Sequence, residues 1–367
     1  MEDKLKIMMT ADTVGGVWTY AMALCEALQP YNVEVHLMTM GKWLNDAQNR
    51  QVRQLDNVIL YESNLKLEWM DDPWDDIKLA EEWIGSVYKK VMPDIIHFNN
   101  YAEVRSEWEC SIITVFHSCV QTWFKAVKSE EAPEMWDRYR AIVERALFLS
   151  DAVVFPTAAM KEQAMQVYGS IPCTKVIYNG GNPASSSSIT KEPFILSAGR
   201  VWDEAKNISL LSEIASQLPW PVAIAGDSAS PDGKVYQPDN VQFLGHLQAG
   251  HLQEQMERAA IFAMPAKYEP FGLAVLEAAS AGCALALSDI STLREIWGDA
   301  ALYFDPNDKE DAARVIRQLT DNEALRQSMA AKAQARAGRY TAEAMAANYM
   351  ELYQKLLEEN RVELTAK

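Results

Sequence analysis

The stretch PAKYEPFGLAVLEAASAG, residues 265–282, places one glutamate on each side of a Pro-Phe-Gly turn. An apolar pattern with helical spacing starts at Leu273 and stops at Gly282, which predicts a helix that begins directly after the turn. The first backbone N–H groups of a helix have no partner inside it and lie at its positive end. We therefore expect the backbone N–H groups near Gly272 and Leu273 to form an anion site, and phosphate suits that position.

The two glutamates of this stretch suggest what is attached to the phosphate. Glu269 precedes the turn, and Glu277 lies about one turn further along the expected helix. Phosphate repels a carboxylate, whereas a hydroxyl donates a hydrogen bond to it, so sugar hydroxyls suit both positions. The alternative is that Glu277 is a solvated helix residue and Glu269 a loop acid, and the spacing alone favours this alternative.

A second stretch, SAGRVWDEAKN at residues 197–207, adds two cations to the same half of the chain. Arg200 follows an expected strand, and Lys206 stands at the start of the next expected helix. A guanidinium fork and an ammonium point charge together can hold a diphosphate without a metal ion. Taken alone, an arginine at a strand end is commonly structural.

Length and charge limit the possible classes of protein. The chain has 367 residues, 49% of them hydrophobic, which is enough for two domains with separate cores. Its formal net charge is −17, and the first 190 residues hold 17 Lys and Arg against 26 Asp and Glu. The remainder holds 17 against 25, so neither half is basic. This disfavours a nucleic-acid partner and strong association with an anionic membrane.

The cysteines and the N-terminus point to a cytoplasmic, soluble protein. The five cysteines are scattered, without the close-spaced pairs of a zinc site, and we interpret them as reduced thiols. The N-terminal MEDKLKIMMTADT lacks the apolar core of a signal peptide, and no segment approaches the roughly 20 apolar residues of a membrane span.

The pattern along the chain predicts two α/β domains. Residues 5–40 are typical of a strand, a glycine loop, a helix and a second strand, and apolar positions at helical spacing predict a helix over 134–149. The Gly/Pro/Ser-rich GGNPASSSSITK, residues 180–191, is typical of a linker, and the alternation of strands and helices restarts beyond it. We expect an N-terminal domain over 1–182, a linker over 183–192 and a C-terminal domain over 193–345. A last helix over about 346–367 is expected to pack across either domain, the first included.

Several motifs together resemble the retaining GT-B glycosyltransferases of group 1, the family of glycogen and sucrose-phosphate synthases. They are AGRVWDEAKN, VQFLGHLQ, MPAKYEPFGLAVLEAASAGCALALSD and LREIWGDAALYFDP, joined by TADTVGGVWTYAMALCEAL, TVFHS and YNGGN nearer the N-terminus. The resemblance covers essentially the whole chain, and the glutamate pair with seven residues between its members is its most specific part. It implies two doubly wound Rossmann-like domains that face a central cleft, with acceptor binding in the first and donor binding in the second.

The resemblance also implies a function and residue roles. The enzyme would move a sugar from a nucleotide-diphosphate donor to a hydroxyl acceptor with retention of configuration and without a metal or other cofactor. Arg200 and Lys206 would bind the diphosphate, Glu269 the donor sugar and Glu277 the ribose. His117 would hydrogen-bond the transferred sugar as donor or acceptor. The other donor-binding residues implied are Gly15, Gly16, Phe271, Gly272 and Leu273, the first two allowing close approach of the backbone.

The sequence departs from the family pattern at Ala266, where many members carry Ser. It also offers Asn99 and Asn100 where many members have a second His or an acid, which leaves the sugar and the acceptor open. We expect UDP-glucose as donor, with GDP-mannose close behind, and a soluble saccharide or small molecule as acceptor. A GT-B epimerase, a phosphorylase and a non-catalytic nucleotide-sugar-binding relative are the alternatives.

Other motifs indicate no further chemistry. His97 and His117 have no third ligand at metal-binding spacing, so hydrogen bonding at strand ends is expected for both. The chain contains no Asp-x-Asp triplet, which favours metal-free catalysis. The acids of DDPWDD, residues 71–76, are expected in a solvated loop rather than a calcium site. TADTVGG is not the dinucleotide fingerprint, which argues against a dehydrogenase.

Overall fold

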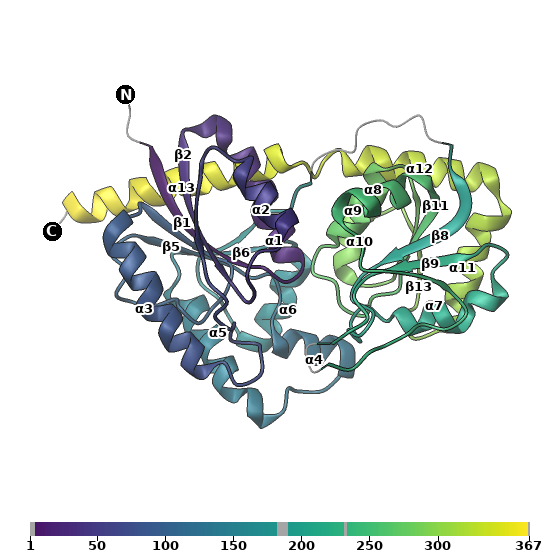
Figure 1. Ribbon diagram of the computed structural model, residues 1–367, viewed down its shortest axis with the longest axis horizontal. Helices are drawn as coiled ribbons and strands as arrows, with labels where there is room; N and C mark the ends of the chain where they lie inside the picture. The colour runs from purple at the N-terminus through teal and green to yellow at the C-terminus, as the bar shows by residue number, and fades with distance from the viewer. Residues whose placement is uncertain (1–3, 182–189, 231–232, 366–367) are drawn as a thin grey trace. The chain divides into compact units, whose positions relative to one another are not determined.

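The computed structural model describes residues 4–181, 190–230 and 233–365 (Figure 1). The chain divides into two compact units. The first comprises Met1–Lys125, Glu130–Gly180 and Ala342–Lys367, and the second comprises Ala126–Ser129 and Gly181–Thr341. Most of the expected linker, residues 183–189, lies outside the described residues.

A seven-stranded sheet forms the centre of the first unit, in the order β3-β2-β1-β4-β5-β6-β7, and every neighbouring pair is parallel. The strands read as nearly continuous apolar runs because helices cover both faces of such a sheet. Their bounds are β1 (Leu5–Asp12), β2 (Val33–Met40), β3 (Val58–Glu62), β4 (Ile95–Phe98), β5 (Ser111–Val115), β6 (Ala152–Phe155) and β7 (Thr174–Val176).

The helices of the first unit begin at sites that the local sequence explains. Asn45 caps one of them by accepting from the backbone N–H of Gln48, whose own side chain accepts from the backbone N–H of Asn45, a complete capping box. The helix expected over 134–149 starts at Asp137, after a 3₁₀ turn. The helices are α1 (Gly16–Ala27), α2 (Asp46–Arg53), α3 (Trp74–Val91), α4 (Val120–Lys128), α5 (Asp137–Leu149), α6 (Ala158–Tyr168) and α13 (Ala342–Thr365). The last residues of α4, from Ala126, are assigned to the second unit.

The prediction of a solvated loop over residues 71–76 is wrong for its last three residues, which are helical. Helix α3 begins at Trp74, after Pro73, and Asp75 and Asp76 occupy its first turn. Acidic side chains are favourable there because they face the positive end of the helix dipole. The two acids therefore stabilise a helix start.

The C-terminal helix α13 belongs to the first unit. Its Tyr349 and Tyr353 are completely buried. The hydroxyl of Tyr353 lies 2.7 Å from Nδ1 of His97, and the hydroxyl of Tyr20 donates to that of Tyr349 at 2.7 Å. Burial lowers the pKa of His97 to about 3, with a smaller contribution from nearby His117, so His97 is a neutral, buried anchor for the helix.

The second unit contains a six-stranded parallel sheet in the order β10-β9-β8-β11-β12-β13. Its strands are β8 (Glu192–Ala198), β9 (Val222–Ala225), β10 (Gln242–Gly245), β11 (Ala259–Met264), β12 (Ala284–Ser288) and β13 (Leu302–Phe304). The sheet has a core on each face. On β11, Phe262 and Met264 join one core, whereas Ile261 and Ala263 join the other, as alternation along a strand requires.

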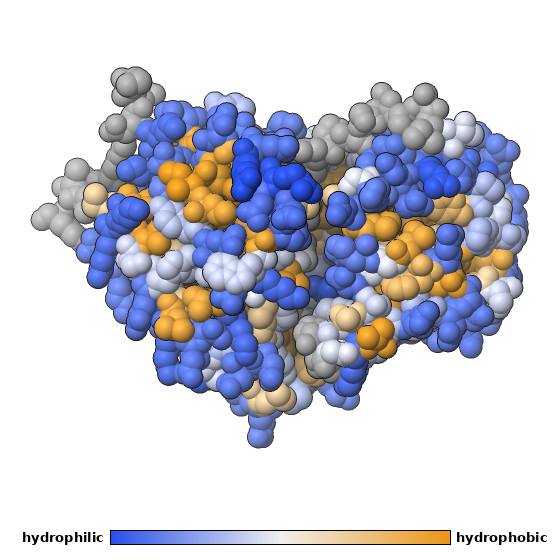
Figure 2. Space-filling model, viewed as in Figure 1, coloured by the Kyte–Doolittle hydropathy of each residue, from blue (hydrophilic) through white to orange (hydrophobic). Residues whose placement is uncertain are grey.

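The helices of the second unit complete a doubly wound α/β arrangement, as the sequence predicts. They are α7 (Ile208–Ile214), α8 (Ala249–Arg258), α9 (Leu273–Ser280), α10 (Ser291–Trp297), α11 (Lys309–Asp321) and α12 (Glu323–Ala337). On the face drawn in Figure 2 most residues are hydrophilic, and apolar residues form several separate groups. Within the described part of the chain, no helix has both the length and the apolar content needed to cross a membrane.

Candidate functional site

Each sheet has a point where the strand order reverses, and the expected site residues follow the strands at those points. In the second unit the reversal lies between β8 and β11, which Arg200 and Glu269 follow. In the first unit it lies between β1 and β4, which Gly15 and Asn99 follow. Ligands of open α/β sheets bind beyond the carboxyl ends of strands at such switch points.

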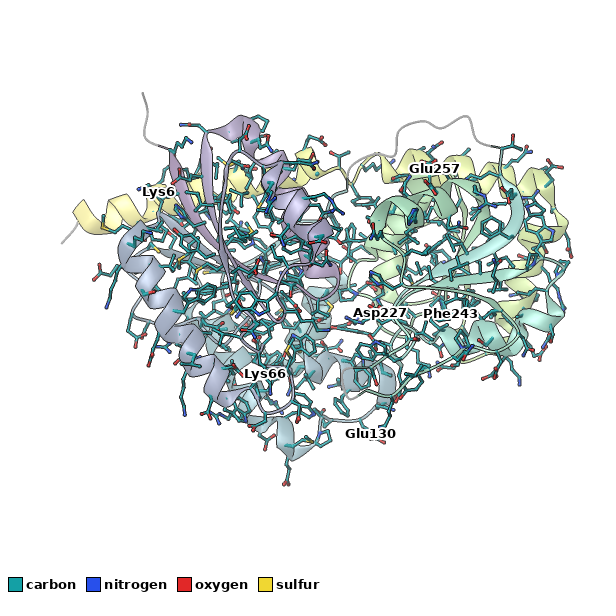
Figure 3. All side chains as sticks on the ribbon, in the orientation of Figure 1. Lys6, Lys66, Glu130, Asp227, Phe243 and Glu257 are labelled. Carbon is teal, nitrogen blue, oxygen red and sulfur yellow. The ribbon has the colours of Figure 1, made fainter. Side chains whose placement is uncertain are left out.

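The position of Arg200 depends on a glycine in the neighbouring loop. Gly226 follows β9 with a φ of 154°, and a Cβ built there would lie 1.8 Å from the carbonyl oxygen of Gly199. The backbone N–H of Val201 donates to the carbonyl of Asp227 at 2.9 Å, and Asp227 is labelled in Figure 3. Because a side chain at position 226 would push the two loops apart, only glycine fits. No role was predicted for Gly226 from the sequence.

The expected cations of the second unit are already paired with acids. Nη2 of Arg200 donates to Asp203 at 2.6 Å, and Nζ of Lys206 donates to Glu269 at 2.5 Å. Burial alone would raise the pKa of Asp203, but Arg200 and Lys206 outweigh it and lower that pKa. Two cations and two carboxylates therefore form one neutral cluster (Arg200, Asp203, Lys206 and Glu269). The pairing of Lys206 with Glu269 was not expected.

Arg200 keeps hydrogen-bonding capacity in this arrangement. Its Nε–H is enclosed and has no partner among the described residues. Its guanidinium carbon lies 5.3 Å from the ring centre of Trp202, within the range of a cation–π contact. An unpaired guanidinium N–H suits a phosphate oxygen, but a ligand reaches this enclosed Nε–H only if the surrounding side chains move.

The Pro-Phe-Gly turn forms the expected helix start. Gly272 has a φ of 91°, a left-handed conformation that favours glycine, and α9 begins at the next residue. No side chain caps this end of the helix. The helix start is confirmed, and no side chain satisfies the first N–H groups of α9, whereas the anion site expected there stays a prediction.

Glu277 is not the solvated residue of the simpler interpretation. The side chain is half-buried and makes no hydrogen bond or ion pair with any described residue. Burial raises the pKa of Glu277 to about 7. A carboxylate that has lost water without gaining a partner is suited to accept hydrogen bonds from ligand hydroxyls.

In the first unit, the glycine loop connects β1 to α1. Asp12 accepts from the backbone N–H of Val14 at 2.6 Å, which holds the start of the loop. Gly15 has a φ of 97° and precedes the helix directly. A Cβ built at Gly16 would meet no atom within 4 Å. The space beside Gly16 is thus open within the described structure.

His117 lies two residues after β5 and is half-buried. Its Nε2 is 2.8 Å from Oδ1 of Asn99, and its ring lies edge-on to that of Tyr20 at 4.7 Å. Burial lowers the pKa of His117 to about 3, so the imidazole is neutral at physiological pH. In the described residues, no group of three or more His, Cys, Asp or Glu is arranged to hold a metal ion.

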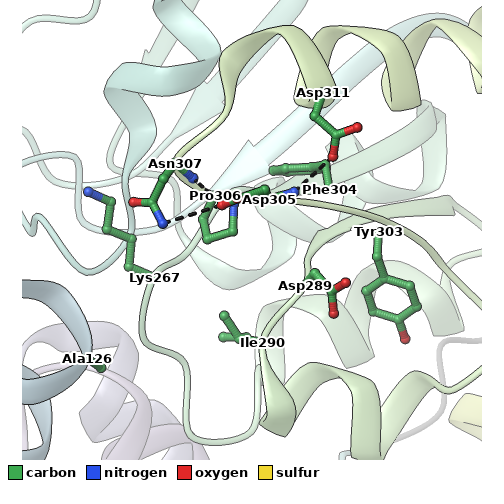
Figure 4. Close-up of a pocket in the computed structure, with 10 residues that line it drawn as sticks. All are labelled: Ala126, Lys267, Asp289, Ile290, Tyr303, Phe304, Asp305, Pro306, Asn307 and Asp311. Atoms are coloured by element: carbon green, nitrogen blue, oxygen red, sulfur yellow. Dashed lines mark hydrogen bonds between the residues drawn. The ribbon is translucent and has the colours of Figure 1, made fainter. Parts of the chain in front are cut away.

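A pocket of about 440 Å³ opens at the carboxyl ends of β11, β12 and β13 (Figure 4). Lys267, Asp289, Asp305 and Asn307 line it, together with other residues. Arg294 binds Asp289 and lowers its pKa, whereas Lys267 has no ion pair among the described residues. Nothing in the local spacing of these residues signals a shared pocket, so no role was predicted for them.

Comparisons with known proteins identify the family of this chain. Residues 182–336 match the family described as glycosyl transferases group 1, and residues 14–184 match glycosyltransferase family 4. The fold and the matched families define the chain as a GT-B glycosyltransferase. It belongs to the group-1 glycosyltransferases.

Curated relatives support this assignment. Glycogen synthase of Mycobacterium tuberculosis is 29% identical over 205 residues, which are 51% of this chain and 50% of the relative. The chain therefore spans about half the length of that relative. An O-antigen chain mannosyltransferase of Escherichia coli is 33% identical over 28% of this chain and 26% of its own.

Two solved structures share the fold. Sucrose-phosphate synthase of Thermosynechococcus elongatus has a TM-score of 0.78 at 19% identity, covering 97% of this chain and 100% of its own. Anabaena HepE, solved with UDP and glucose, has a TM-score of 0.73 at 16% identity, covering 96% of this chain and 100% of its own. At these identities the likeness concerns the fold alone.

Proposed function

We propose that the protein transfers a sugar from a nucleotide-diphosphate donor to a hydroxyl group of an acceptor, with retention of configuration. The neutral cluster of Arg200, Asp203, Lys206 and Glu269 carries this proposal. It stands at a strand-order switch point. It also adjoins the uncapped start of α9 in sequence, since Glu269 lies four residues before Leu273.

The cluster suits a diphosphate because its cations are held in place before the ligand binds. An entering diphosphate would compete with Asp203 and Glu269 for Arg200 and Lys206. Because Arg200 and Lys206 are already held in position, they need little rearrangement as charge develops on the departing phosphate. Glu269, released from Lys206, could accept hydrogen bonds from sugar hydroxyls. Glu277 would accept those of the ribose.

In the proposed reaction, the bond from the sugar C1 to the phosphate oxygen breaks and a bond from C1 to the acceptor oxygen forms on the same face. The departing phosphate oxygen takes the proton of the acceptor hydroxyl. Positioning and charge stabilisation supply the catalysis. Because Arg200 and Lys206 offset the diphosphate charge, we propose that the reaction needs no metal ion.

The donor that we propose is UDP-glucose. HepE was solved with UDP-glucose, and glycogen synthase is a relative, whereas mannosyltransferase relatives keep GDP-mannose as the second candidate. We further propose a soluble acceptor and a cytoplasmic location, because the first 190 residues are net acidic, which disfavours docking on an anionic membrane.

A thermal-shift panel of nucleoside diphosphates and their sugars tests the donor site. A ligand at about 100 times its dissociation constant adds about 2.7 kcal/mol to the free energy of unfolding. We expect one nucleotide to raise the melting temperature, and Lys206→Ala to lose most of that rise. If no nucleoside diphosphate or nucleotide sugar stabilises the protein, the proposed donor site is wrong.

A further inference from the structure

Asn99 is held in one orientation by Thr10, a residue of the neighbouring strand. Asn99 directly follows β4, and Thr10 is a fully buried residue of β1. The backbone N–H of Asn99 donates to Oγ1 of Thr10 at 2.9 Å, and the side-chain Nδ2 donates to the carbonyl oxygen of Thr10 at 2.7 Å. The Asn99 side chain is itself almost completely buried.

These contacts fix which end of the Asn99 amide faces which neighbour. A backbone carbonyl only accepts hydrogen bonds, so the group 2.7 Å from the oxygen of Thr10 must be the NH₂ group. The reverse orientation would place two oxygen atoms against each other there. The amide oxygen Oδ1 is therefore the atom that faces His117.

The orientation of the amide in turn determines where His117 carries its proton. Oδ1 of Asn99 can only accept, and it lies 2.8 Å from Nε2 of His117, so Nε2 must carry the hydrogen. A neutral imidazole has one N–H, which leaves a lone pair on Nδ1. That Nδ1 has no hydrogen-bond partner among the described residues. It is also absent from the buried polar atoms that lack a partner, so Nδ1 is accessible to solvent.

We propose that Asn99 is a positioning residue that fixes His117 in the neutral Nε2–H form, so that Nδ1 is a permanent hydrogen-bond acceptor for the substrate. The substrate group at His117 must then be a donor, such as a hydroxyl. A phosphate or ring oxygen would meet a lone pair and is excluded. The substrate identity rests on the proposed function, whereas the state of His117 does not.

The surroundings of His117 favour the neutral form. Among the described residues, the titratable groups recorded next to its ring are His97 of β4 and Tyr20 of α1. His97 is itself neutral, and the Tyr20 hydroxyl donates to Tyr349. Burial lowers the pKa of His117, and no carboxylate of the described residues contributes to that shift. An added carboxylate is therefore the perturbation to test.

Long-range ¹H–¹⁵N correlation spectra of the histidine-labelled protein test the proposal without substrate. The chain has five histidines, and a His117→Gln variant identifies the signals of residue 117. We expect a neutral ring protonated at Nε2, unchanged from about pH 8 to about pH 5, because the pKa of His117 is about 3. A proton on Nδ1, or titration within that range, would overturn the proposal.

Asn99→Asp tests whether Asn99 sets this state. A carboxylate beside Nε2–H favours the imidazolium and should raise the pKa of His117 by roughly 1–3. Asn57→Asp is the matched control, because Asn57 is also buried and its Nδ2 donates to a backbone carbonyl, that of Cys25, at 2.9 Å. The control should lose comparable stability and leave the His117 signals unchanged.

Measurements of kcat/KM against pH test the acceptor role of His117 separately from the proposed sugar transfer. With a nucleotide sugar that is transferred, Asn99→Asp should lose kcat/KM as the pH falls through the raised pKa of His117, because an imidazolium Nδ1–H cannot accept. The wild type should show only the pH dependence that Glu277 gives to donor binding, which both proteins share. An Asn99→Asp profile that parallels that of the wild type, despite a raised pKa in the spectra, would refute an acceptor role for Nδ1. If no nucleotide sugar is transferred, the proposed function fails, and the spectra still decide the state of His117.

Discussion

Lys206 and Glu269 hold each other 2.5 Å apart and are both mostly buried, so neither side chain acts alone. Breaking such a pair leaves a charge that has lost both its partner and part of its water. Arg200 and Asp203 form a similar pair three residues apart. The roles of the single residues therefore have to be separated by variants that keep the charge of the cluster balanced.

Lys206→Ala should lower kcat by roughly two to three orders of magnitude, because one cation that stabilises the leaving group is lost. It also leaves Glu269 as an unpaired carboxylate that repels the diphosphate. The double variant Lys206→Ala/Glu269→Gln removes that repulsion and should bind the nucleoside diphosphate more tightly than Lys206→Ala. Steady-state kinetics and calorimetry measure both. Near-normal turnover in Lys206→Ala would remove the residue from the leaving-group role.

Glu277 should make stability and nucleotide affinity depend on pH in opposite directions. Its folded pKa, about 7, exceeds the ordinary value of 4.5, so the folded protein binds this proton more tightly than the unfolded chain. The stability that the proton contributes is complete below about pH 4.5 and is lost as the pH rises through about 7. Denaturant titrations should show this loss in the wild type and not in Glu277→Gln.

Ribose hydroxyls donate more strongly to a charged carboxylate, so nucleotide affinity in the wild type should rise across the same pH range. The Glu277→Gln variant should bind more weakly and without that rise. Parallel pH profiles for the two proteins would mean that Glu277 does not contact the nucleotide.

At the scale of single elements, replacing glycine by alanine should have opposite effects on stability in the loops that contain Gly16 and Gly226. Gly16→Ala adds a methyl group where no atom lies within 4 Å, so the free energy of unfolding should hold or rise slightly. If a ligand approaches this loop closely, the affinity of the Gly16→Ala variant for that ligand should fall.

Gly226→Ala is the contrasting variant, because its Cβ would overlap the backbone of Gly199. It should destabilise the fold by more than 1 kcal/mol, on the order expected for an incompatible backbone.

Binding assays and denaturant unfolding measure both variants. Unchanged substrate affinity in Gly16→Ala would show that no ligand approaches that loop closely.

The strands and the start of α9 could be predicted because their signals are local. Buried parallel strands read as apolar runs, and the Pro-Phe-Gly turn before an apolar helical pattern marks a helix start. The start of α3 was missed because its acids resemble a solvated loop. The contacts of the site could not be predicted, since Lys206 and Glu269 are 63 residues apart and Asn99 and Thr10 are 89 apart. Sequence spacing does not report which loops meet at a switch point.

At the scale of the whole molecule, the two units repeat one design with different chemistry. Each places its candidate residues beyond the strands at which the order of its sheet reverses. The second unit gathers balanced charges and an uncapped helix, which suit a diphosphate. In the first unit, the neutral side chains of His117 and Asn99 are hydrogen-bonded to each other, and neutral polar groups suit hydroxyls. This difference is the reason why we propose donor binding in the second unit.

The most direct test of the proposed transfer is the configuration at C1 of the product, determined by NMR in excess EDTA. The wild type is expected to transfer the sugar from its nucleotide donor with the donor's configuration retained, while Lys206→Ala does so roughly 100-fold or more slowly. Inversion at C1, or activity that EDTA abolishes and Mn²⁺ restores, would contradict a metal-free site built on Arg200 and Lys206.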